Sequence, residues 1–243
     1  MNKNLKFIPV LATTFIVGIT SLEHTAKSAT TVYSNSNVTN TNIKNQSVSE
    51  DSKVSSLHSY YSLGYLELKN VQGDLEKGSL RFPFIDGPDI LVKQFNATED
   101  AIGSKDVFVV MEKTKNFNRG YLYTDSIGGI TPTNQKHYID YVSYPAINIK
   151  KYNGQFILEE PITNFYIFKE KISLKELDFK LRKILIEKHK LYKKDGYTSG
   201  QIIVYTNDGG KYTFELNKKL QEHRMKDYID GSKIKNITIE LKK

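Results

Sequence analysis

Polar side chains that could bind a ligand are concentrated in one C-terminal segment, Lys211–Arg224. Alternation along a strand would place its aromatic and aliphatic residues on one face and its hydroxyl and carboxylate on the other. Two lysines and an arginine follow in a predicted turn and short helix. The candidate binding residues are a hydroxyl, a carboxylate and three cations: Thr213, Glu215, Lys218, Lys219 and Arg224.

These groups have the chemistry to bind an anionic sugar. A hydroxyl and a carboxylate can hydrogen-bond sugar hydroxyls, while a cation pairs with the carboxylate of the sugar. Arg224 suits that carboxylate because its planar guanidinium forms two parallel charge-assisted bonds. The alternative interpretation is an exposed hairpin followed by a charged turn, and the spacing alone leaves both open.

The rest of the sequence contains no pattern typical of an enzyme. The five histidines have no spacing that would place two metal ligands on one helix face. There is no cysteine, no nucleophile elbow, no phosphate-binding loop and no dinucleotide fingerprint. We therefore expect no catalytic residue, no metal site and no cofactor, and a protein that acts by binding.

The first residues predict export. Lys3 and Lys6 precede an apolar stretch, Phe7–Leu22, which is too short for a membrane anchor. Small residues, Ala26 and Ser28, then predict a signal peptide over residues 1–28. The expected location is extracellular, without insertion into a membrane, and the absence of cysteine favours a bacterial secretion route.

Residues 29–56 are rich in Ser, Thr and Asn and predict a flexible leader, because they offer little apolar surface to bury. A short helix over Leu57–Ser62 is expected next. Residues 57–145 then predict about five short strands and a small closed barrel, with an OB fold as the leading candidate and a β-sandwich as the alternative. The expected strands are Ser79–Ile85, Ile90–Phe95, Val107–Glu112 and Gly120–Thr124.

Residues 146–243 predict an α+β domain in which one helix lies across a sheet. Ser173 and Glu176 form a capping box, and leucines follow at helical spacing. Asn207–Gly210 predicts a hairpin turn. The expected strands are Ala146–Ile149, Gln155–Leu158, Gln201–Thr206, Lys211–Leu216 and Asn236–Leu241, and Asn164–Phe168 adds an apolar run.

Charge is divided unevenly between the two expected domains. Residues 57–145 have a net charge of −2, whereas residues 146–243 have a net charge of +8. Outside a cell, such a basic domain meets anionic glycans and acidic proteins before nucleic acid, so no nucleic-acid partner is expected. The lysines of the predicted helix are interpreted as a solvated face, and Asp178 and Arg182 as a surface ion pair.

Four segments resemble the staphylococcal and streptococcal superantigen toxins, and within them the staphylococcal superantigen-like (exotoxin-like) proteins. The resemblance covers about residues 57–243, and Ile127 stands where the toxins usually have Tyr. The segments are Lys169–Leu185 followed by Leu191 and Tyr192, Ser126–Thr131, Asp208–Leu216 and His223–Gly231.

The resemblance implies an N-terminal OB fold and a C-terminal β-grasp domain. It also implies a non-enzymatic virulence factor that blocks innate immunity. A subset of the family binds sialylated glycans through a Thr, a Glu, a Lys and an Arg, which match Thr213, Glu215, Lys218 or Lys219, and Arg224. The expected partners are sialyl-Lewis or sialyl-lactosamine glycans on leukocyte glycoproteins, and a homodimer would strengthen a weak glycan site.

Two other functions remain open. The chain could inhibit one host receptor, immunoglobulin or complement protein in serum through a glycan-independent protein interface. A true T-cell superantigen is the weaker alternative, because no zinc cluster is expected and Ile127 departs from the toxin pattern.

Overall fold

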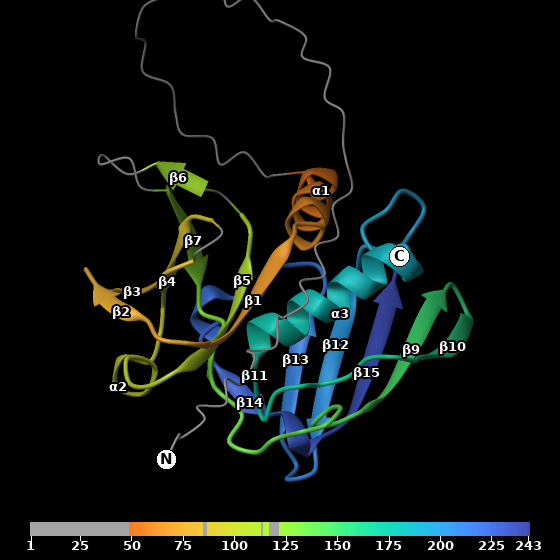
Figure 1. Cartoon of the computed structure of the whole chain (residues 1–243). Coiled ribbons are helices and arrows are strands. Elements are labelled where there is room, and N and C mark those ends of the chain that lie inside the picture. The colour runs from red at the N-terminus through yellow and green to blue at the C-terminus, as the bar shows by residue number, and fades with distance from the viewer. Residues whose placement is uncertain (1–48, 85–86, 113, 117–121) are drawn as a thin grey trace, which may run out of the picture. The chain divides into compact units, whose positions relative to one another are not determined.

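The computed structural model describes residues 49–84, 87–112, 114–116 and 122–243 (Figure 1). These residues belong to one compact unit. The expected signal peptide and the expected leader up to residue 48 lie outside the described residues. Among the residues that are described, no helix is long and apolar enough to cross a membrane.

Helix α1 (Glu50–Tyr61) begins earlier than expected and includes residues that we had assigned to the leader. The hydroxyl of Ser49 accepts a hydrogen bond from the N–H of Ser52 (3.3 Å) and caps the first turn. Glu50 and Asp51 place negative charge at the positive end of the helix dipole. This cap explains why a segment with little apolar surface is helical.

The N-terminal strands form an OB-fold barrel, as expected, so the β-sandwich alternative is wrong. Three strands pair in the order β1-β5-β8 and five in the order β2-β3-β4-β7-β6. The short helix α2 (Ala97–Asp100) follows β4. The strands are β1 (Tyr65–Val71), β2 (Asp74–Glu76), β3 (Ser79–Phe82), β4 (Asp89–Lys93), β5 (Lys105–Val110), β6 (Thr114–Asn116), β7 (Leu122–Ile127) and β8 (Ile130–Pro132).

Strand β5 explains how the barrel and the second domain share a core. Val107 and Val109 face the barrel interior, where they pack with Leu80 and Phe82. The alternating residue Phe108 belongs instead to the core cluster that contains helix α3. Both faces of the strand are therefore covered, which explains its continuous apolar run.

The C-terminal residues form a β-grasp domain with a five-stranded sheet in the order β10-β9-β15-β12-β13 (Figure 1). Strands β9 and β15 are parallel and the other pairs are antiparallel. A separate pair joins β11 and β14. The elements are β9 (Ala146–Asn153), β10 (Phe156–Ile162), β11 (Lys171–Ser173), α3 (Leu174–His189), β12 (Ser199–Thr206), β13 (Lys211–Glu215), η1 (Glu222–Arg224), β14 (Tyr228–Asp230), η2 (Gly231–Lys233) and β15 (Ile234–Lys242).

The apolar run Asn164–Phe168 is not a strand of the sheet. Residues 164–168 contain only an isolated bridge between Ile167 and Ser143. Asn164 has a left-handed backbone with φ 64°, which interrupts an extended run directly after β10. The apolar pattern of the segment therefore reflects burial of Phe165 and Ile167 rather than strand pairing.

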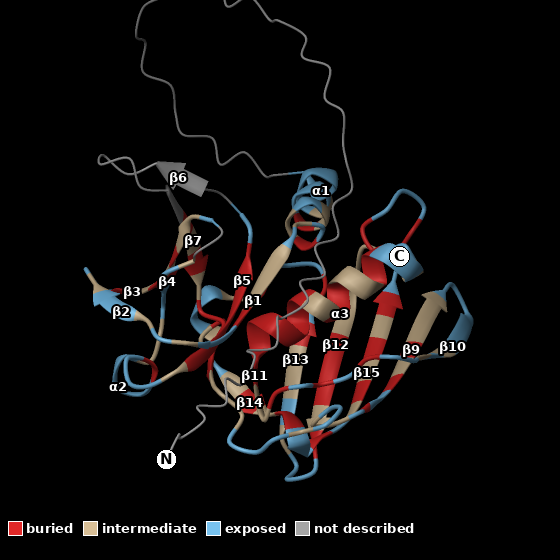
Figure 2. Ribbon diagram, viewed as in Figure 1, coloured by how far each residue is buried: buried red, intermediate tan, exposed pale blue. Residues whose placement is uncertain are grey.

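Helix α3 is covered on more than the side that faces the sheet. The Ser173 half of the capping box is confirmed, because the Ser173 hydroxyl accepts from the N–H of Glu176 at 3.1 Å, while the Glu176 carboxylate accepts from Lys169 and Lys180. Leu177, Phe179 and Leu185 are buried together with Tyr61 of α1 in one cluster. The solvated lysine face that we expected is wrong in its first turns, which Figure 2 shows buried against the rest of the molecule.

Lys175 is the clearest consequence of this packing. Its side chain is 3% exposed, and its Nζ donates to the Ser126 hydroxyl of β7 at 2.8 Å. Burial lowers the pKa of Lys175 to about 7, although the charge of Glu112 acts in the opposite direction. The lysine therefore links α3 to the barrel with an ammonium that loses its proton near neutral pH.

We predict that the protein becomes more stable as the pH rises from 7 to about 9.5. The unfolded lysine titrates near pH 10.4, so below that pH the unfolded chain holds the proton more tightly. The free energy of unfolding should rise by about 2–3 kcal/mol over this range. Urea denaturation at several pH values measures it.

Lys175→Met should remove most of this rise. Lys180→Met is the control, because burial lowers the pKa of Lys180 but Glu176 and Glu67 raise it further, so its titration lies above this range. An unchanged rise in Lys175→Met would show that Lys175 is not the titrating group.

Candidate functional site

The candidate residues Thr213 and Glu215 lie on β13, the edge strand of the five-stranded sheet. The intervening Phe214 is buried, while Thr213 is half-buried and Glu215 is exposed, which agrees with the predicted alternation. Thr213 faces Ile203 of β12, and its carbonyl points away from that strand, because it accepts a bond from Arg224. Thr213 and Ile203 therefore form a non-hydrogen-bonded pair, in which the N–H of Thr213 points away from β12 on the same side as its carbonyl.

Arg224, at the end of η1, is held against this free edge. Its Nη1 donates to the carbonyl of Thr213 at 3.0 Å and to the side-chain oxygen of Gln221 at 3.1 Å. The guanidinium also lies 5.5 Å from the centre of the Phe214 ring. Both hydrogen bonds involve Nη1, so Nη2 and Nε can donate to a ligand.

The two candidate lysines have different surroundings. The ammonium of Lys218 pairs with the carboxylate of Glu215, and both side chains are about half exposed. Lys219 instead lies 3.4 Å from Glu112, and its Nζ is 3.6 Å from the centre of the Tyr60 ring. Thr213 thus pairs with Arg224, and Glu215 pairs with Lys218 on the same edge strand, whereas Lys219 contacts Glu112 and Tyr60.

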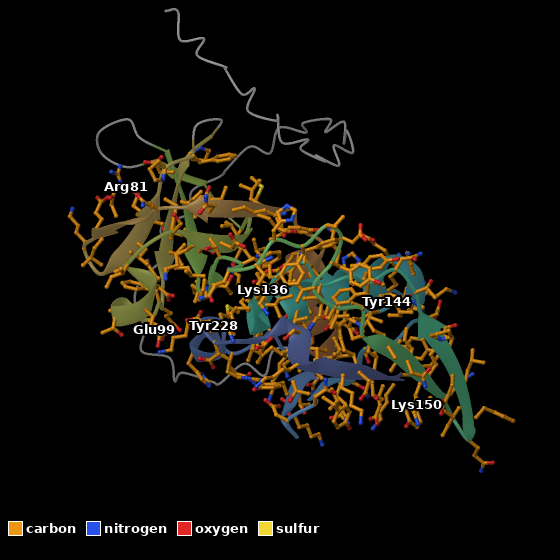
Figure 3. The ribbon with its side chains drawn as sticks, turned by 60° about the horizontal axis from the view of Figure 1, so that its bottom comes forward. Arg81, Glu99, Lys136, Tyr144, Lys150 and Tyr228 are labelled. Atoms are coloured by element: carbon orange, nitrogen blue, oxygen red, sulfur yellow. The ribbon has the colours of Figure 1, made fainter. Side chains whose placement is uncertain are left out.

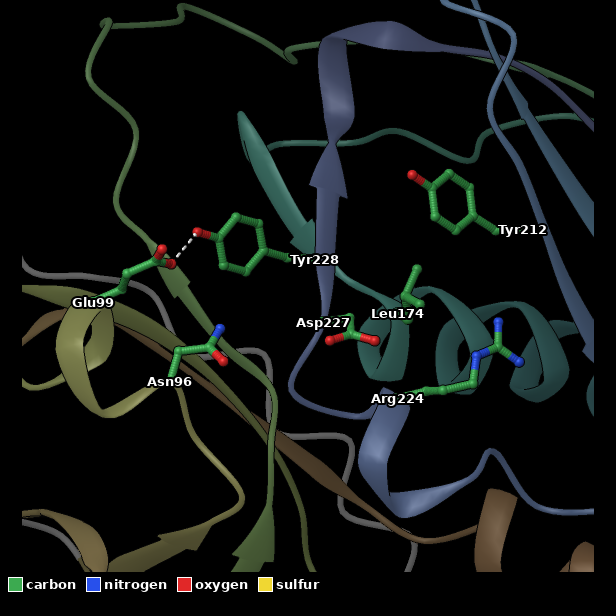
Figure 4. A pocket seen from close by; sticks show the side chains of 7 residues that line it. All are labelled: Asn96, Glu99, Leu174, Tyr212, Arg224, Asp227 and Tyr228. Carbon is green, nitrogen blue, oxygen red and sulfur yellow. Dashed lines mark hydrogen bonds between the residues drawn. The ribbon is translucent and has the colours of Figure 1, made fainter.

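An open cavity of about 480 Å³ lies beside Arg224 (Figure 4). The hydroxyl of Tyr228 donates to the Glu99 carboxylate at 3.0 Å, and the two residues also lie together in Figure 3. Burial and this bond raise the pKa of Tyr228. The lining residues come from both domains: Asn96, Glu99, Leu174, Tyr212, Arg224, Asp227 and Tyr228.

The sequence interpretation missed four polar residues of this cavity. Asp227 follows Arg224 by only a few positions and carries a carboxylate, so its position was a usable signal. Glu99 lies in α2 and Asn96 directly precedes that helix, far from Arg224 in the sequence, and no local pattern connects them to Arg224. In the sequence, Tyr228 has no feature that distinguishes it from other tyrosines in strands.

A buried arginine fixes the backbone that follows Thr213. Arg182 is 0% exposed, so the expected surface ion pair with Asp178 is wrong in its location. Its Nη2 donates to the carbonyl of Glu215 at 3.0 Å, and its Nη1 to the carbonyl of Leu216 at 3.3 Å. Its Nε donates to Asp178 at 2.7 Å. Burial by itself lowers the pKa of Arg182, but the Asp178 carboxylate together with the Tyr61 and Tyr192 side chains outweighs it and raises the pKa.

A tyrosine of α1 completes the support of this segment. The Tyr61 hydroxyl donates to the second oxygen of Asp178 at 2.6 Å and accepts from the N–H of Leu220 at 3.2 Å. Burial raises the pKa of Tyr61, and the charge of Asp178 adds to the effect, so the hydroxyl keeps the proton that it donates. Both ends of the segment 215–220 are therefore tied to buried groups.

The barrel also contacts the residue after Arg224. The N–H of Gly129 donates to the Met225 carbonyl at 2.8 Å. Gly128 has a φ of 57°, and a Cβ at this position would overlap the carbonyl group of Met225. Only glycine allows this approach, so the Gly128–Gly129 turn positions the backbone that carries Arg224.

The site provides cations, carboxylates, a hydroxyl and the outward N–H of Thr213, which are suited to binding a polar anion. In the part of the chain that the structure describes, no group of three or more His, Asp or Glu residues could hold a metal ion.

Comparison with known proteins identifies similar chains. Residues 145–241 match the family described as staphylococcal/streptococcal toxin, beta-grasp domain. The chain is 42% identical over 189 residues to superantigen-like protein 11 of Staphylococcus aureus. This match covers 76% of this chain and 94% of that protein. It is 50% identical over 137 residues to staphylococcal superantigen-like 3 of S. aureus strain NCTC 8325 / PS 47, a match that spans 56% of this chain and 36% of the relative's length.

A solved structure has the same fold. The staphylococcal superantigen-like protein SSL5, crystallised in complex with sialyl Lewis X, superimposes with a TM-score of 0.67 at 38% sequence identity. The match covers 78% of this chain and all of that one.

We predict that Gly128→Ala displaces Arg224 and destabilises the protein. The added methyl group must push the Met225 backbone away and also occupies a left-handed conformation, so we expect a loss of about 2–4 kcal/mol in unfolding free energy. Chemical denaturation measures the loss, and the NMR signal of the Arg224 Nε–H reports the displacement.

Gly154→Ala is the matched control. Gly154 also has a positive φ, 61°, but nothing lies near the position of its Cβ. It should lose only about 1 kcal/mol and leave the Arg224 signal in place. Equal losses in the two variants would contradict a supporting role for the Met225 contact.

Proposed function

Because the chain belongs to the staphylococcal superantigen-like proteins, we propose that it is a secreted, non-enzymatic immune-evasion protein that binds host sialylated glycans. Its ligands are glycans of the sialyl-Lewis or sialyl-lactosamine type on leukocyte glycoproteins. The binding site is the free edge of β13 together with Arg224.

The observation that carries this proposal is the hydrogen bond from Arg224 to the Thr213 carbonyl. It places the free guanidinium nitrogens beside an outward-pointing backbone N–H and a hydroxyl. A carboxylate accepts charge-assisted bonds from such donors, which are about twice as strong as neutral ones. The carboxylate of sialic acid therefore fits between Arg224 and Thr213.

The charges around this point favour an anionic sugar. Lys218 neutralises Glu215, so the Glu215 carboxylate can accept bonds from sugar hydroxyls without repelling the sialic acid. Asp227 and Tyr212 in the adjoining cavity offer an acceptor and an aromatic ring to the neutral sugars that follow. The net charge of +8 over residues 146–243 attracts anionic glycans from a distance.

The similarity to the complex of SSL5 with sialyl Lewis X supports the proposal. That protein has the same fold at 38% identity. The family resemblance also matches Thr213, Glu215, Lys218 or Lys219, and Arg224 to glycan-binding positions; Arg224 contacts Thr213, and Lys218 pairs with Glu215 on the same strand.

We predict that residues 29–243 bind sialylated glycans on an array and that Arg224→Ala weakens binding by about 10–100-fold, since it removes a charged hydrogen-bond donor. Thr213→Pro should abolish binding because it removes the outward N–H. Thr213→Val keeps this N–H and should retain part of the affinity.

Lys219→Ala is the matched control, because Lys219 contacts Glu112 and Tyr60 rather than the β13 edge. It should bind like the parent protein. Absence of binding by the folded parent protein would refute the glycan site. Sialidase treatment of neutrophils should abolish cell binding; undiminished binding would instead favour a glycan-independent protein interface.

A further inference from the structure

The cavity beside Arg224 continues from the β13 edge to the barrel. Its wall includes Asn96, which directly precedes α2, and Glu99 within that helix. In Figure 4 these two residues lie on one side of the view and Arg224 on the other, with Asp227 between them. The volume of about 480 Å³ is typical of pockets that bind small ligands. A ligand held at Arg224 therefore has room to extend toward the barrel.

Several polar groups of the cavity wall have no partner within the part of the chain that the structure describes. The amide of Asn96, the carboxylate of Asp227 and the hydroxyl of Tyr212 make no hydrogen bond there. One oxygen of Glu99 accepts from Tyr228 at 3.0 Å, which leaves the second oxygen open. Such groups bond to water in the free protein and can exchange that water for the hydroxyls of a ligand.

The barrel side of the cavity is fixed before any ligand binds. The backbone N–H of Asn96 donates to the Asp100 carboxylate at 2.8 Å, and the buried Lys105 donates to the Glu99 carbonyl. The Tyr228 hydroxyl holds the Glu99 side chain. A wall that is ordered in advance loses less conformational freedom on binding.

The charges of the cavity favour a neutral ligand that is rich in hydroxyls. Arg224 is the only cation among the lining residues that the structure describes, and the proposed function assigns it to the carboxylate of sialic acid. Toward the barrel the wall has two carboxylates, Glu99 and Asp227, which repel a second anion. Carboxylates and amides accept bonds from the hydroxyls of neutral sugars, and tyrosine rings offer flat apolar faces to a sugar ring.

We propose that Asn96 and Glu99 of the barrel form a second sugar subsite, so that both domains bind one oligosaccharide. This inference rests on the proposed function, because it starts from a sialic acid held at Arg224. The neutral sugars that follow lie along the cavity beside Asp227 and Tyr212. A hexose beyond them hydrogen-bonds to the Asn96 amide and to the open oxygen of Glu99. The chain then prefers sialylated glycans with a longer neutral chain to a sialylated trisaccharide.

Two glycans of different length test this subsite on residues 29–243. A sialyl-lactosamine trisaccharide and a pentasaccharide with one further lactosamine unit differ only in neutral sugars. Surface plasmon resonance is expected to show about tenfold tighter binding of the pentasaccharide, since a pair of added hydrogen bonds is worth about that factor. Equal affinity of the parent protein for the two glycans would overturn the second subsite and leave the proposed function intact.

Variants of α2 locate the gain. Combined Asn96→Ala and Glu99→Ala substitutions should reduce the affinity for the pentasaccharide to the value that the parent protein has for the trisaccharide. Thr98→Ala is the matched control, because Thr98 is exposed on the same helix and does not line the cavity. It should keep the full gain. A gain that persists in the double variant would contradict the assignment, and circular dichroism establishes that each variant is folded.

NMR gives a readout that does not depend on a substitution in the complex. The side-chain amide signals of Asn96, assigned by their absence in Asn96→Ala, should shift with the pentasaccharide and stay in place with the trisaccharide. Signals that stay in place with both bound glycans would overturn the proposal.

A third glycan tests the neutral character of the subsite. When a second sialic acid replaces the added lactosamine unit, its carboxylate faces Glu99 and Asp227, so the affinity should not rise above that for the trisaccharide. Tighter binding of this disialylated glycan than of the pentasaccharide would contradict a neutral subsite. Binding of none of the three glycans would refute the proposed function itself, and this inference with it.

Discussion

The buried guanidinium of Arg182 is the contact on which the two domains and the candidate site all depend. A charge without access to water is costly unless a counter-charge and hydrogen bonds surround it. Asp178 supplies the counter-charge, and the carbonyls of Glu215 and Leu216 together with the Tyr192 hydroxyl accept the remaining bonds. The acceptors come from α3, from the residue Tyr192 that follows it and from the end of β13, so the arginine is satisfied only when these parts are assembled.

The same network makes the β-grasp site dependent on the N-terminal part of the chain. Tyr61 of α1 holds Asp178, Gly129 of the barrel holds Met225, and Tyr60 and Glu112 hold Lys219. Every one of these contacts lies within a few residues of Arg224 or Glu215 or acts through Arg182. The residues that offer chemistry come from one domain, whereas the rigidity that fixes their geometry comes from both. A rigid site loses less conformational freedom when it binds a flexible oligosaccharide.

Local patterns in the sequence predicted much of this arrangement. The helix cap at Ser173, the turn at Asn207–Gly210 and the alternation that separates Thr213 and Glu215 from the buried Phe214 are short-range features, and the structure contains each of them. The main error of the sequence-based prediction concerned which charged side chains are buried. The spacing of Asp178 and Arg182 predicts an ion pair, but a four-residue spacing carries no information about which partner covers it. Likewise, no local pattern distinguishes the roles of Lys218 and Lys219. They differ because Lys219 contacts Tyr60 and Glu112, which are distant in the sequence.

The two edges of the β-grasp sheet illustrate how differently an open strand can be used. At β13 the outward carbonyl of Thr213 is occupied by Arg224, so a ligand meets a charged group rather than a row of free peptide groups. At β10 the side chains of Phe156, Ile157 and Leu158 are exposed instead, and Pro161 has no N–H to offer. An edge strand that holds a guanidinium is suited to a carboxylate, which accepts charge-assisted hydrogen bonds from it.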